Sequence, residues 1–427
     1  MRRWSLALLL LASCGPKPPV RTALQGGLAD LKRDIASAQK DGKLDRDVAV
    51  SLAQAVGERE LTSAEGSNGA LRVRSLRSCA RSLRSAMEQR AKSDDDVAAE
   101  LTLILLETHA ADRTTLLNRY ARSDSGAWRA VAARAAVRPV DSDLRKAFYF
   151  DPDERVRRTS LTAAYDAHDA GELEPLLEAA RLDPDPQSQS LAVRAVGAIG
   201  GERAVLALKD TWAQADDTLR IAIVDAWSEH ASFVVGGARE LSLAAEGSGL
   251  AAVSASYALA RAGGVESVVA NARLRRNISE GTDDEKRLAL SVAPLSPETE
   301  AAIVKASHDA SAELRVVALT RMSNIPLHRT EAITALRDLA NAKPGSESEV
   351  RARDAAVSSL AQTGDTSVSA SLLLNLQDKS LTTRARAARA LTSLGDYTHA
   401  VSALADEDAN LRSEVACSIL ARENAHR

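Results

Sequence analysis

Apolar and polar residues along this chain follow the period of an α-helix. In segments such as residues 173–182 and 204–212, apolar side chains recur three or four positions apart, which places them on one helix face. No stretch of useful length shows the strict alternation that a half-buried β-strand requires. The pattern therefore predicts an all-α protein.

The helical pattern repeats at a nearly constant interval. Each copy has an apolar residue followed by arginine, with small or apolar residues about four and seven positions later. Successive copies from Val97 to Leu411 lie 28 to 38 residues apart, which suits a two-helix unit and is too long for one helix. Clear copies begin at Trp128, Val156, Leu219, Leu314 and Leu411, weaker ones at Leu71, Lys286, Ala352 and Thr383, and copies without arginine near Val97, Ser188 and Ala252.

Acidic residues and glycines mark the ends of these units. Asp-rich stretches such as 151–153 and 183–186 precede many copies, and aspartate side chains favour helix N-termini. Glycines such as Gly364 and Gly395 follow several second helices, where a left-handed residue ends a helix at little cost. We expect the arginine of each copy to pair with the acidic cap of a neighbouring unit, which is a structural role. These arginines are Arg129, Arg157, Arg220, Arg315, Arg353, Arg384 and Arg412.

This combination resembles the HEAT family of helical repeats, in particular the short bacterial type also found in phycobilin lyases (the PBS-lyase type). The family motif is Asp-Pro, a short gap, Val-Arg and an alanine-rich helix that ends in Leu-Gly. Val156-Arg157 and residues 352–364 and 383–395 match it well. The resemblance implies an α-solenoid of about twelve HEAT-like two-helix repeats over residues 67–427, in which neighbours stack because one unit cannot bury its apolar face alone.

Residues 28–66 fit the repeat poorly. Leu28, Leu31 and Ile35 have the spacing of one helix face, and the segment 48–56 suggests a second helix. We predict an N-terminal helical cap that covers the first repeat.

The N-terminus has the features of an export signal. Arg2 and Arg3 precede the apolar run 6–12, which is too short to cross a bilayer as a helix. Leu11-Ala12-Ser13-Cys14 resembles the lipobox of bacterial lipoprotein signal peptides. That resemblance implies that the signal peptide, residues 1–13, is removed and that Cys14 is lipidated. No cofactor is expected apart from this covalent lipid.

The segment after Cys14 is expected to be a flexible tether. Residues 14–27 contain three prolines and no clear periodicity, and residues 15–27 could reach at most roughly 45 Å. By resemblance to lipoprotein sorting rules, Gly15 favours the outer membrane. We therefore expect a lipid-anchored protein of the cell envelope, at the outer membrane.

Composition and charge limit the core and the partners. Apolar residues make up 45% of the chain but aromatic residues only 3%, which suits thin layers of closely packed helices. The net charge is -3, and removal of Arg2 and Arg3 takes Lys+Arg from 55 to 53 against 58 acidic residues, or -5. Because this charge provides no field that would gather nucleic acid, we expect envelope proteins as partners and no nucleic acid.

The sequence contains no assembled catalytic or metal-binding motif. HExxH, a Gly-rich phosphate loop, CxxC and Gly-x-Ser-x-Gly are all missing from it. Asp166, His168, Asp169 and Glu172 form one cluster, which we interpret as a solvated turn between helices, with a metal site as the less favoured alternative.

The cysteines and tryptophans of the repeats are interpreted as core residues. Cys79 and Cys417 lie among apolar neighbours near opposite ends of the repeat array. We expect no bridge between them, because a disulfide needs Cα atoms within about 7 Å. Trp128 and Trp227 occupy packed repeat positions and Trp212 a helix end, so a role as a ligand platform is secondary.

One charged feature stands out near the N-terminus. Arg74, Arg77, Arg81 and Arg84 recur three or four residues apart, which predicts a basic stripe on a single helix. A solvated face that is partly neutralised by Glu88 or by residues 94–96 is the simpler interpretation. The alternative is a patch for anionic headgroups or an acidic partner.

The preferred functional hypothesis is a non-catalytic, lipid-anchored scaffold that binds envelope proteins. The alternatives are an enzyme that resembles bilin lyases or HEAT-like DNA glycosylases, and a structural subunit of a larger envelope machine. Export and negative charge disfavour the enzymatic alternatives.

Overall fold

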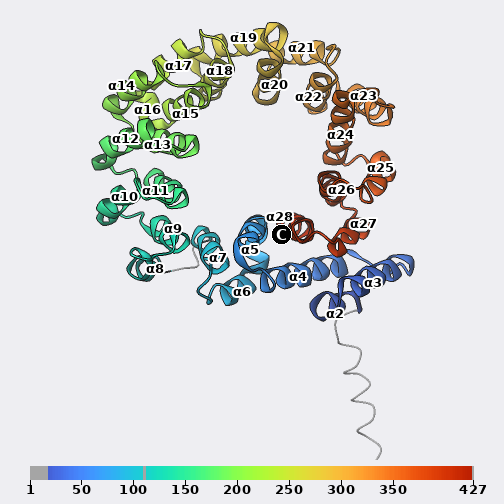
Figure 1. Cartoon of the computed structure of the whole chain (residues 1–427). Coiled ribbons are helices and arrows are strands. Elements are labelled where there is room, and N and C mark those ends of the chain that lie inside the picture. The colour runs from blue at the N-terminus through green and yellow to red at the C-terminus, as the bar shows by residue number, and fades with distance from the viewer. Residues whose placement is uncertain (1–17, 109–111, 426–427) are drawn as a thin grey trace, which may run out of the picture. The chain divides into compact units, whose positions relative to one another are not determined.

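The computed structural model describes residues 18–108 and 112–425, which form helices joined by short turns (Figure 1). No strand occurs within these ranges, so the predicted all-α class is confirmed, and it takes the form of an α-solenoid of successive helix pairs. The signal peptide and Cys14 lie outside the described residues. The chain divides into unit 1, residues 1–110 with 357–427, and unit 2, residues 111–356.

Unit 2 is a succession of helix pairs in which the second helix of each pair packs on the second helix of the next. Contacts of this kind join α9 to α11, α11 to α13, α13 to α15 and α15 to α18. The bounds are α8 (Arg113–Tyr120), α9 (Gly126–Ala135), η2 (Pro139–Asp141), α10 (Ser142–Phe148), α11 (Glu154–Ala167), η3 (Ala170–Glu172), α12 (Leu173–Leu182), α13 (Pro186–Ile199), α14 (Gly201–Trp212), α15 (Asp217–Ser228), α16 (His230–Ser232), η4 (Phe233–Gly237), α17 (Ala238–Ala244), α18 (Leu250–Ala262), α19 (Gly264–Glu280), α20 (Asp283–Val292), α21 (Pro297–Ala306), α22 (Ala312–Met322), α23 (Arg329–Asn341) and α24 (Glu347–Gln362), which continues into unit 1.

Small residues let these helices approach closely. A Cβ atom added to Gly197 on α13 would lie 2.5 Å from the Cα atom of Ala226 on α15, which is nearer than real Cβ atoms come. The core of this region is built from alanine, valine and leucine with few aromatic side chains. The thin core that the composition predicted therefore follows from close helix packing.

Aspartate side chains begin many of the second helices. Asp153 accepts a hydrogen bond from the Arg155 amide, and Asp216 accepts one from the Leu219 amide. Asp185 caps α13 in the same way, and the Arg158 guanidinium that is hydrogen-bonded to it holds the pKa of that carboxyl well below its usual range. The acidic stretches thus satisfy backbone N–H groups that have no partner within the helix.

Unit 1 is built from both ends of the chain. Leu52 and Leu83 from the N-terminal segment share one hydrophobic core with Val415 and Ile419 from the C-terminal segment. The N-terminal elements are α2 (Pro18–Gln25), α3 (Leu28–Lys40), α4 (Arg46–Thr62), α5 (Gly66–Arg74), η1 (Arg77–Cys79), α6 (Ala80–Arg90) and α7 (Asp96–Glu107). The C-terminal elements after α24 are η5 (Thr366–Val368), α25 (Ser369–Asn375), α26 (Leu381–Leu394), α27 (Tyr397–Ala400), η6 (Val401–Ala405) and α28 (Ala409–Ala425).

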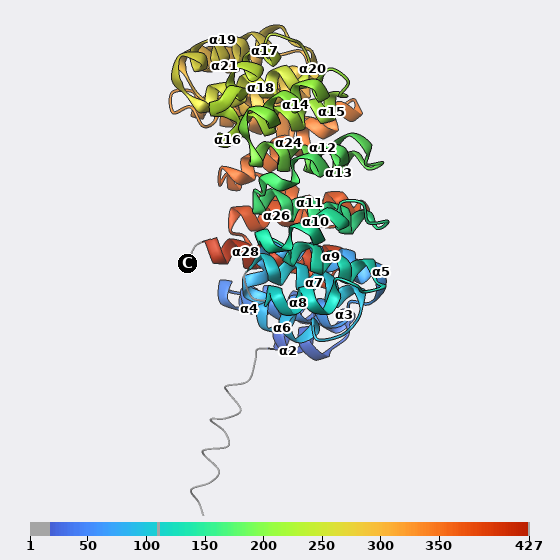
Figure 2. The ribbon, with the colours of Figure 1, turned by 90° about the vertical axis from the view of Figure 1, so that its left-hand side faces the viewer.

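Helix α4 takes the place of a further repeat beside α28. In both views the C-terminal α28 lies beside the N-terminal α4, and the two helices pack together (Figures 1 and 2). Helix α4 also packs on α6. The predicted cap segment therefore contacts α28 of the last repeat and also α6, which follows the cap in the chain.

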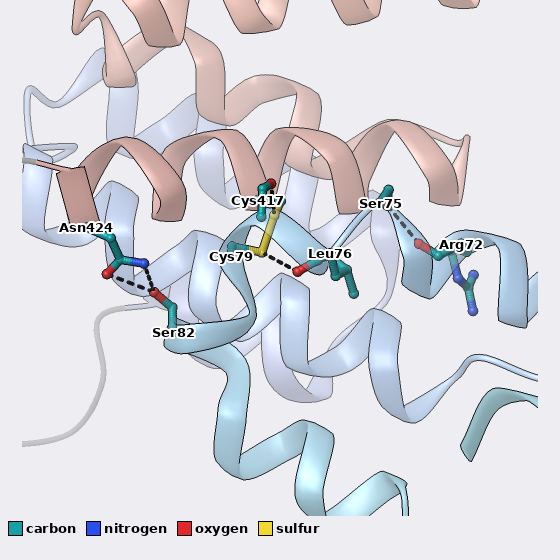
Figure 3. The surroundings of a disulfide bond; sticks show 8 residues. Arg72, Ser75, Leu76, Cys79, Ser82, Cys417 and Asn424 are labelled. Atoms are coloured by element: carbon teal, nitrogen blue, oxygen red, sulfur yellow. Dashed lines mark hydrogen bonds between the residues drawn. A yellow bond between two sulfur atoms is a disulfide. The ribbon is translucent and has the colours of Figure 1, made fainter. Parts of the chain in front are cut away.

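Cys79 and Cys417 form a disulfide, so the expectation that they are unbridged is wrong. Their Cα atoms lie 5.1 Å apart, and Figure 3 shows the bond between α28 and the end of η1. Beside the bond, the amide of Asn424 donates to the hydroxyl of Ser82 at 3.0 Å. The expectation failed because it treated sequence separation as distance in space, whereas the two ends of the chain share one unit.

Part of the segment expected to be a tether is helical, since α2 extends from Pro18 to Gln25. Ala23 on α2 is fully buried, and the hydroxyl of Thr22 donates to Asp34 at 2.6 Å. Arg59 on α4 donates to the carbonyl of Gly26 at 3.0 Å. The flexible segment expected over residues 14–27 is therefore wrong from Pro18 onward, because prolines are well tolerated in the first turn of a helix.

We predict that the Cys79–Cys417 bond contributes strongly to the stability of unit 1. The bond closes a loop with a sequence separation of 338 residues, and loop-closure entropy sets its contribution at up to about 5 kcal/mol. Cys79→Ala with Cys417→Ala should lower the urea midpoint, while Ser78→Ala beside the bond should change it little. Two alkylatable thiols at positions 79 and 417 in protein isolated from an oxidising compartment would contradict this prediction.

Candidate functional site

Five of the seven repeat arginines share one local geometry. Each of the five lies four residues after the N-cap of its helix, and its Nη1 donates to the two carbonyls just before that N-cap. In α11, Arg157 donates to the Asp151 carbonyl at 2.9 Å and to the Pro152 carbonyl at 3.4 Å. The same contacts are made by Arg129 to Ser123 and Asp124, Arg315 to Asp309 and Ala310, Arg384 to Asp378 and Lys379, and Arg412 to Asp406 and Glu407.

The other edge of the guanidinium reaches the next repeat. Arg157 Nε donates to the carboxylate of Asp183 at 2.8 Å, and Asp183 stands two residues before the N-cap of α13. Asp183 also accepts from the Asp185 amide and so holds its own turn. We call this contact the inter-repeat ion pair. It recurs at Arg129–Asp151 (2.9 Å), Lys286–Asp309 (3.3 Å) and Arg384–Asp406 (2.8 Å).

The arginine of the last repeat pairs with a carboxylate from the N-terminal segment of the chain. Arg412 on α28 donates to the carboxylate of Glu60 on α4 at 2.7 Å. Glu60 is buried and also pairs with Arg72, 3.2 Å away. Helix α4 therefore supplies the carboxylate that a following repeat would otherwise provide.

Two of the predicted repeat arginines are placed differently. Arg220 lies over the ring of Trp212, with its guanidinium carbon 5.5 Å from the ring centre, and its pair with Asp217 is long at 4.0 Å. Arg353 pairs with its neighbour Asp354 at 3.1 Å. Within the described residues, these two arginines form no inter-repeat ion pair, and neither does Arg315, which contacts only the carbonyls of its own turn.

One inter-repeat ion pair is replaced by two glutamines. Gln189 occupies the arginine position of α13, and Gln214 stands two residues before the N-cap of α15, where the aspartate would be. Gln189 keeps the contact with its own turn, because its amide donates to the Asp183 carbonyl at 2.8 Å. Both glutamines line a groove of about 640 Å³ between α12, α13, α14 and α15. The groove lies where the charged contact is missing.

The groove combines apolar surface with carboxylates. Its walls include Leu177, Leu219 and Leu182, whose side chain remains 69% exposed. Arg181, Asp210 and Asp216 also line it, and within the described residues neither carboxylate forms an ion pair, although Asp216 accepts a hydrogen bond from the Leu219 amide. An apolar side chain next to a cationic one would satisfy both features, and the glutamine amides can bind backbone groups. We call this feature the α12–α15 groove.

The four arginines near the N-terminus do not form one helical stripe, which corrects the expectation. Arg74 ends α5, Arg77 lies in η1, and Arg81 and Arg84 lie in α6. At the end of α5 the Ser75 hydroxyl donates to the Arg72 carbonyl at 2.7 Å, and the tight turn that follows directs Cys79 toward α28.

Most of this basic charge is neutralised within unit 1. Arg74 pairs with Glu100 at 2.8 Å, Arg77 with Glu107 and Arg84 with Glu88. For Arg81, neither a hydrogen bond nor an ion pair occurs within the part of the chain that the structure describes. The simpler interpretation, a face partly neutralised by acids such as Glu88, describes this arrangement.

A buried charged cluster in unit 2 was missed from the sequence. Arg145 on α10 donates to the carboxylate of Glu172 at 3.0 Å, and both side chains are almost completely buried. The hydroxyl of Tyr149 also donates to Glu172, and burial with the nearby carboxylate raises the pKa of this tyrosine. The expectation of a solvated turn is therefore wrong for Glu172. Periodicity gave no signal, because the arginine occupies a position that looks polar.

The acidic and histidine cluster does not assemble into a ligand set. Asp166 pairs with Arg134 at 2.7 Å, and Asp169 lies 3.5 Å from Arg145. Across residues 18–108 and 112–425, no group of three or more His, Cys, Asp or Glu side chains could hold a metal ion. Within the same residues, no helix combines the length and the apolar character needed to span a bilayer.

The tryptophans of unit 2 contribute mainly to packing. Trp128 is buried and stacks on Tyr120, with ring centres 4.1 Å apart. Trp227 is also buried, and it contacts the half-buried Trp212 at 5.3 Å between ring centres. These positions agree with the expectation that the rings are core residues first.

Comparisons with known proteins find similarity only among solved structures, since no protein-family model and no curated protein matches this chain. A mutant of Kap121p aligns at 11% identity with a TM-score of 0.33, over 96% of this chain and 48% of that chain. She4p aligns at 12% identity and a TM-score of 0.30, over 91% of this chain and 74% of that one. Kap95p with RanGDP aligns at 12% identity with a TM-score of 0.29, over 89% of this chain and 56% of that chain.

This chain thus spans about half the length of Kap121p. The TM-scores are low, so the assignment to a helical-repeat fold depends on the helix packing described above.

Replacing Glu172 should strongly destabilise unit 2. Glu172→Gln leaves Arg145 buried without its carboxylate, and removal of one partner of a buried pair costs about 3–5 kcal/mol. Glu174→Gln, two residues away, removes only an exposed pair with Arg203 and should cost no more than about 1 kcal/mol. Urea denaturation measures both, and equal losses would contradict the buried role of Glu172.

Restoring the missing inter-repeat ion pair should stabilise unit 2 and fill part of the α12–α15 groove. Gln189→Arg with Gln214→Asp should show a favourable coupling of up to about 1 kcal/mol in a double-mutant cycle. The converse pair, Arg157→Gln with Asp183→Gln, removes an existing contact and serves as the control. Zero coupling between positions 189 and 214 would show that these residues do not form an equivalent inter-repeat position.

Proposed function

We propose that this protein is a lipid-anchored scaffold of the cell envelope, at the outer membrane, which binds other proteins and catalyses no reaction. Its attachment is a lipid on Cys14, the last residue of the Leu11-Ala12-Ser13-Cys14 motif. The partner is an extended segment of an envelope protein that binds in the α12–α15 groove.

The disulfide supports export. Disulfide bonds form and persist in oxidising compartments and are rare where cytosolic reductants act. Both sulfur atoms of Cys79–Cys417 are buried in the core of unit 1, so the bond is part of the folded unit. This feature is independent of the signal-peptide motif and agrees with it.

The α12–α15 groove is the observation that carries the binding role. Apolar walls, two glutamine amides, the guanidinium of Arg181 and the carboxylates of Asp210 and Asp216 lie on one accessible surface. We infer that the bound segment places an apolar side chain against Leu177 and Leu182, beside a lysine or arginine. Backbone groups of the segment would bind the amides of Gln189 and Gln214.

The anchor is tested by Cys14→Ser. We expect this variant to lose metabolic labelling by fatty acid and to leave the membrane fraction, because one cysteine carries all acyl chains. Ser13→Ala, next to it, is the control and should keep both properties. Labelling that persists in Cys14→Ser would refute the anchor.

The binding role is tested with a photo-crosslinking amino acid at Leu182, in cells that express the protein at native level. A discrete adduct with an envelope protein is expected, and it should be lost with Gln189→Arg and Gln214→Asp, which fill the groove with an ion pair. Leu327 is 87% exposed in unit 2 outside the groove, and it is the matched crosslinking control. The same adducts from Leu182 and Leu327 would contradict a groove-specific partner.

A further inference from the structure

The distance between the lipidated cysteine and the folded protein is short. Helix α2 begins at Pro18, only four residues after Cys14. At about 3.5 Å for each extended residue, the Cα atom of Cys14 lies within roughly 14 Å of that of Pro18. Unit 1 therefore begins almost at the point of attachment.

Helix α2 is firmly held by the rest of unit 1. It packs on α3 and α4, and Thr22 and Gly26 are hydrogen-bonded to Asp34 and Arg59. The short segment before Pro18 thus cannot be lengthened by unwinding α2 without breaking these contacts. The distance from the anchor to the unit is set by chain length alone.

The headgroup layer of the bilayer takes up much of the distance between Cys14 and Pro18. Headgroups add about 5–7 Å to each side of the hydrocarbon core, and acyl chains on Cys14 occupy that core. Less than roughly 10 Å is then left between the headgroup surface and the start of α2, which is no more than the diameter of one helix. Part of unit 1 must lie against the lipid surface.

The exposed face of α2 has a composition suited to that surface. One side of the helix carries the exposed residues Arg21, Leu24 and Gln25. Ala23 is buried on the other side. Leu24 is 46% exposed, so it offers apolar surface beside a cationic side chain. Arginine can bind lipid phosphates, and each basic residue near an anionic surface favours binding about fivefold.

We propose that Arg21, Leu24 and Gln25 on α2 form a membrane-contact face that lies on phospholipid headgroups and holds unit 1 against the bilayer. This inference depends on the proposed lipidation of Cys14. It places the membrane beside α2, and not beside the broken arginine cluster Arg74 to Arg84, whose charges are largely paired.

A fluorescent probe at position 24 tests the contact. The chain has three cysteines, one proposed to be lipidated and two joined in a disulfide, so Leu24→Cys adds a single free thiol. The lipidated full-length protein carries an environment-sensitive dye there, in vesicles of mixed zwitterionic and anionic phospholipid. We expect nitroxide attached to the lipid headgroups to quench the dye. We also expect aqueous iodide to quench it severalfold less than it quenches the same dye on protein that lacks the lipid and is free in solution without detergent.

Leu374→Cys is the matched control within unit 1. Leu374 is 74% exposed on α25, which lies apart from α2 within unit 1 (Figure 1). Its dye should stay accessible to iodide. Equal iodide quenching at positions 24 and 374, in protein whose mass shows the lipid, would overturn the contact while leaving the anchor intact. Protein without lipid would instead refute the proposed function.

Lengthening the segment before Pro18 tests whether the short connection holds α2 at the lipid surface. About 20 Gly and Ser residues inserted between Lys17 and Pro18 add a mean reach of roughly 25 Å. The dye at position 24 should then become more accessible to iodide, because α2 is no longer held at the surface. Unchanged protection would overturn the role of the short connection.

Discussion

The structure depends on the need of each thin helix pair to bury its apolar face against another pair. In a row of such pairs the last one has no neighbour, and its exposed face costs hydrophobic free energy. Here the last helix, α28, is covered by α4 from the N-terminal segment, which shares its core. The two ends of the chain thus stabilise each other, and the disulfide and Arg412–Glu60 join them at the same surface.

The repeat arginines explain how neighbouring helix pairs keep their positions relative to one another. Five of the seven repeat arginines bind the two carbonyls of their own turn, and several of these five also reach an aspartate of the next repeat that in turn holds its own loop. An ion pair of this kind contributes modestly to stability, but its geometry fixes the position of one repeat relative to the next. At Gln189 and Gln214 that constraint is absent, and an accessible groove occupies the space.

The sequence was sufficient for local features and insufficient for contacts between distant segments. Period, acidic caps and the arginine positions are encoded within one repeat, so the helices and their class could be predicted. The partner of Cys79 could not, because nothing in a local pattern states that residues 79 and 417 meet. Likewise the carboxylate of Glu60 looks like any exposed acid until α28 covers it. The groove could have been found from the replacement of arginine by Gln189, had the position of its acid partner been known.

The short connection to Cys14 links the fold to the proposed role. A long tether would let a scaffold sample a wide volume, whereas the proposed lipid on Cys14, four residues before Pro18, would fix unit 1 at the lipid surface and restrict its orientation. Because the N-terminal segment that would carry the proposed anchor also covers α28, a force on that lipid would act on the joined ends of the chain. The disulfide and the ion pairs of Glu60 therefore stand where such a load would otherwise separate α4 from α28. The proposed anchoring and the folding stability would thus depend on the same few helices of unit 1.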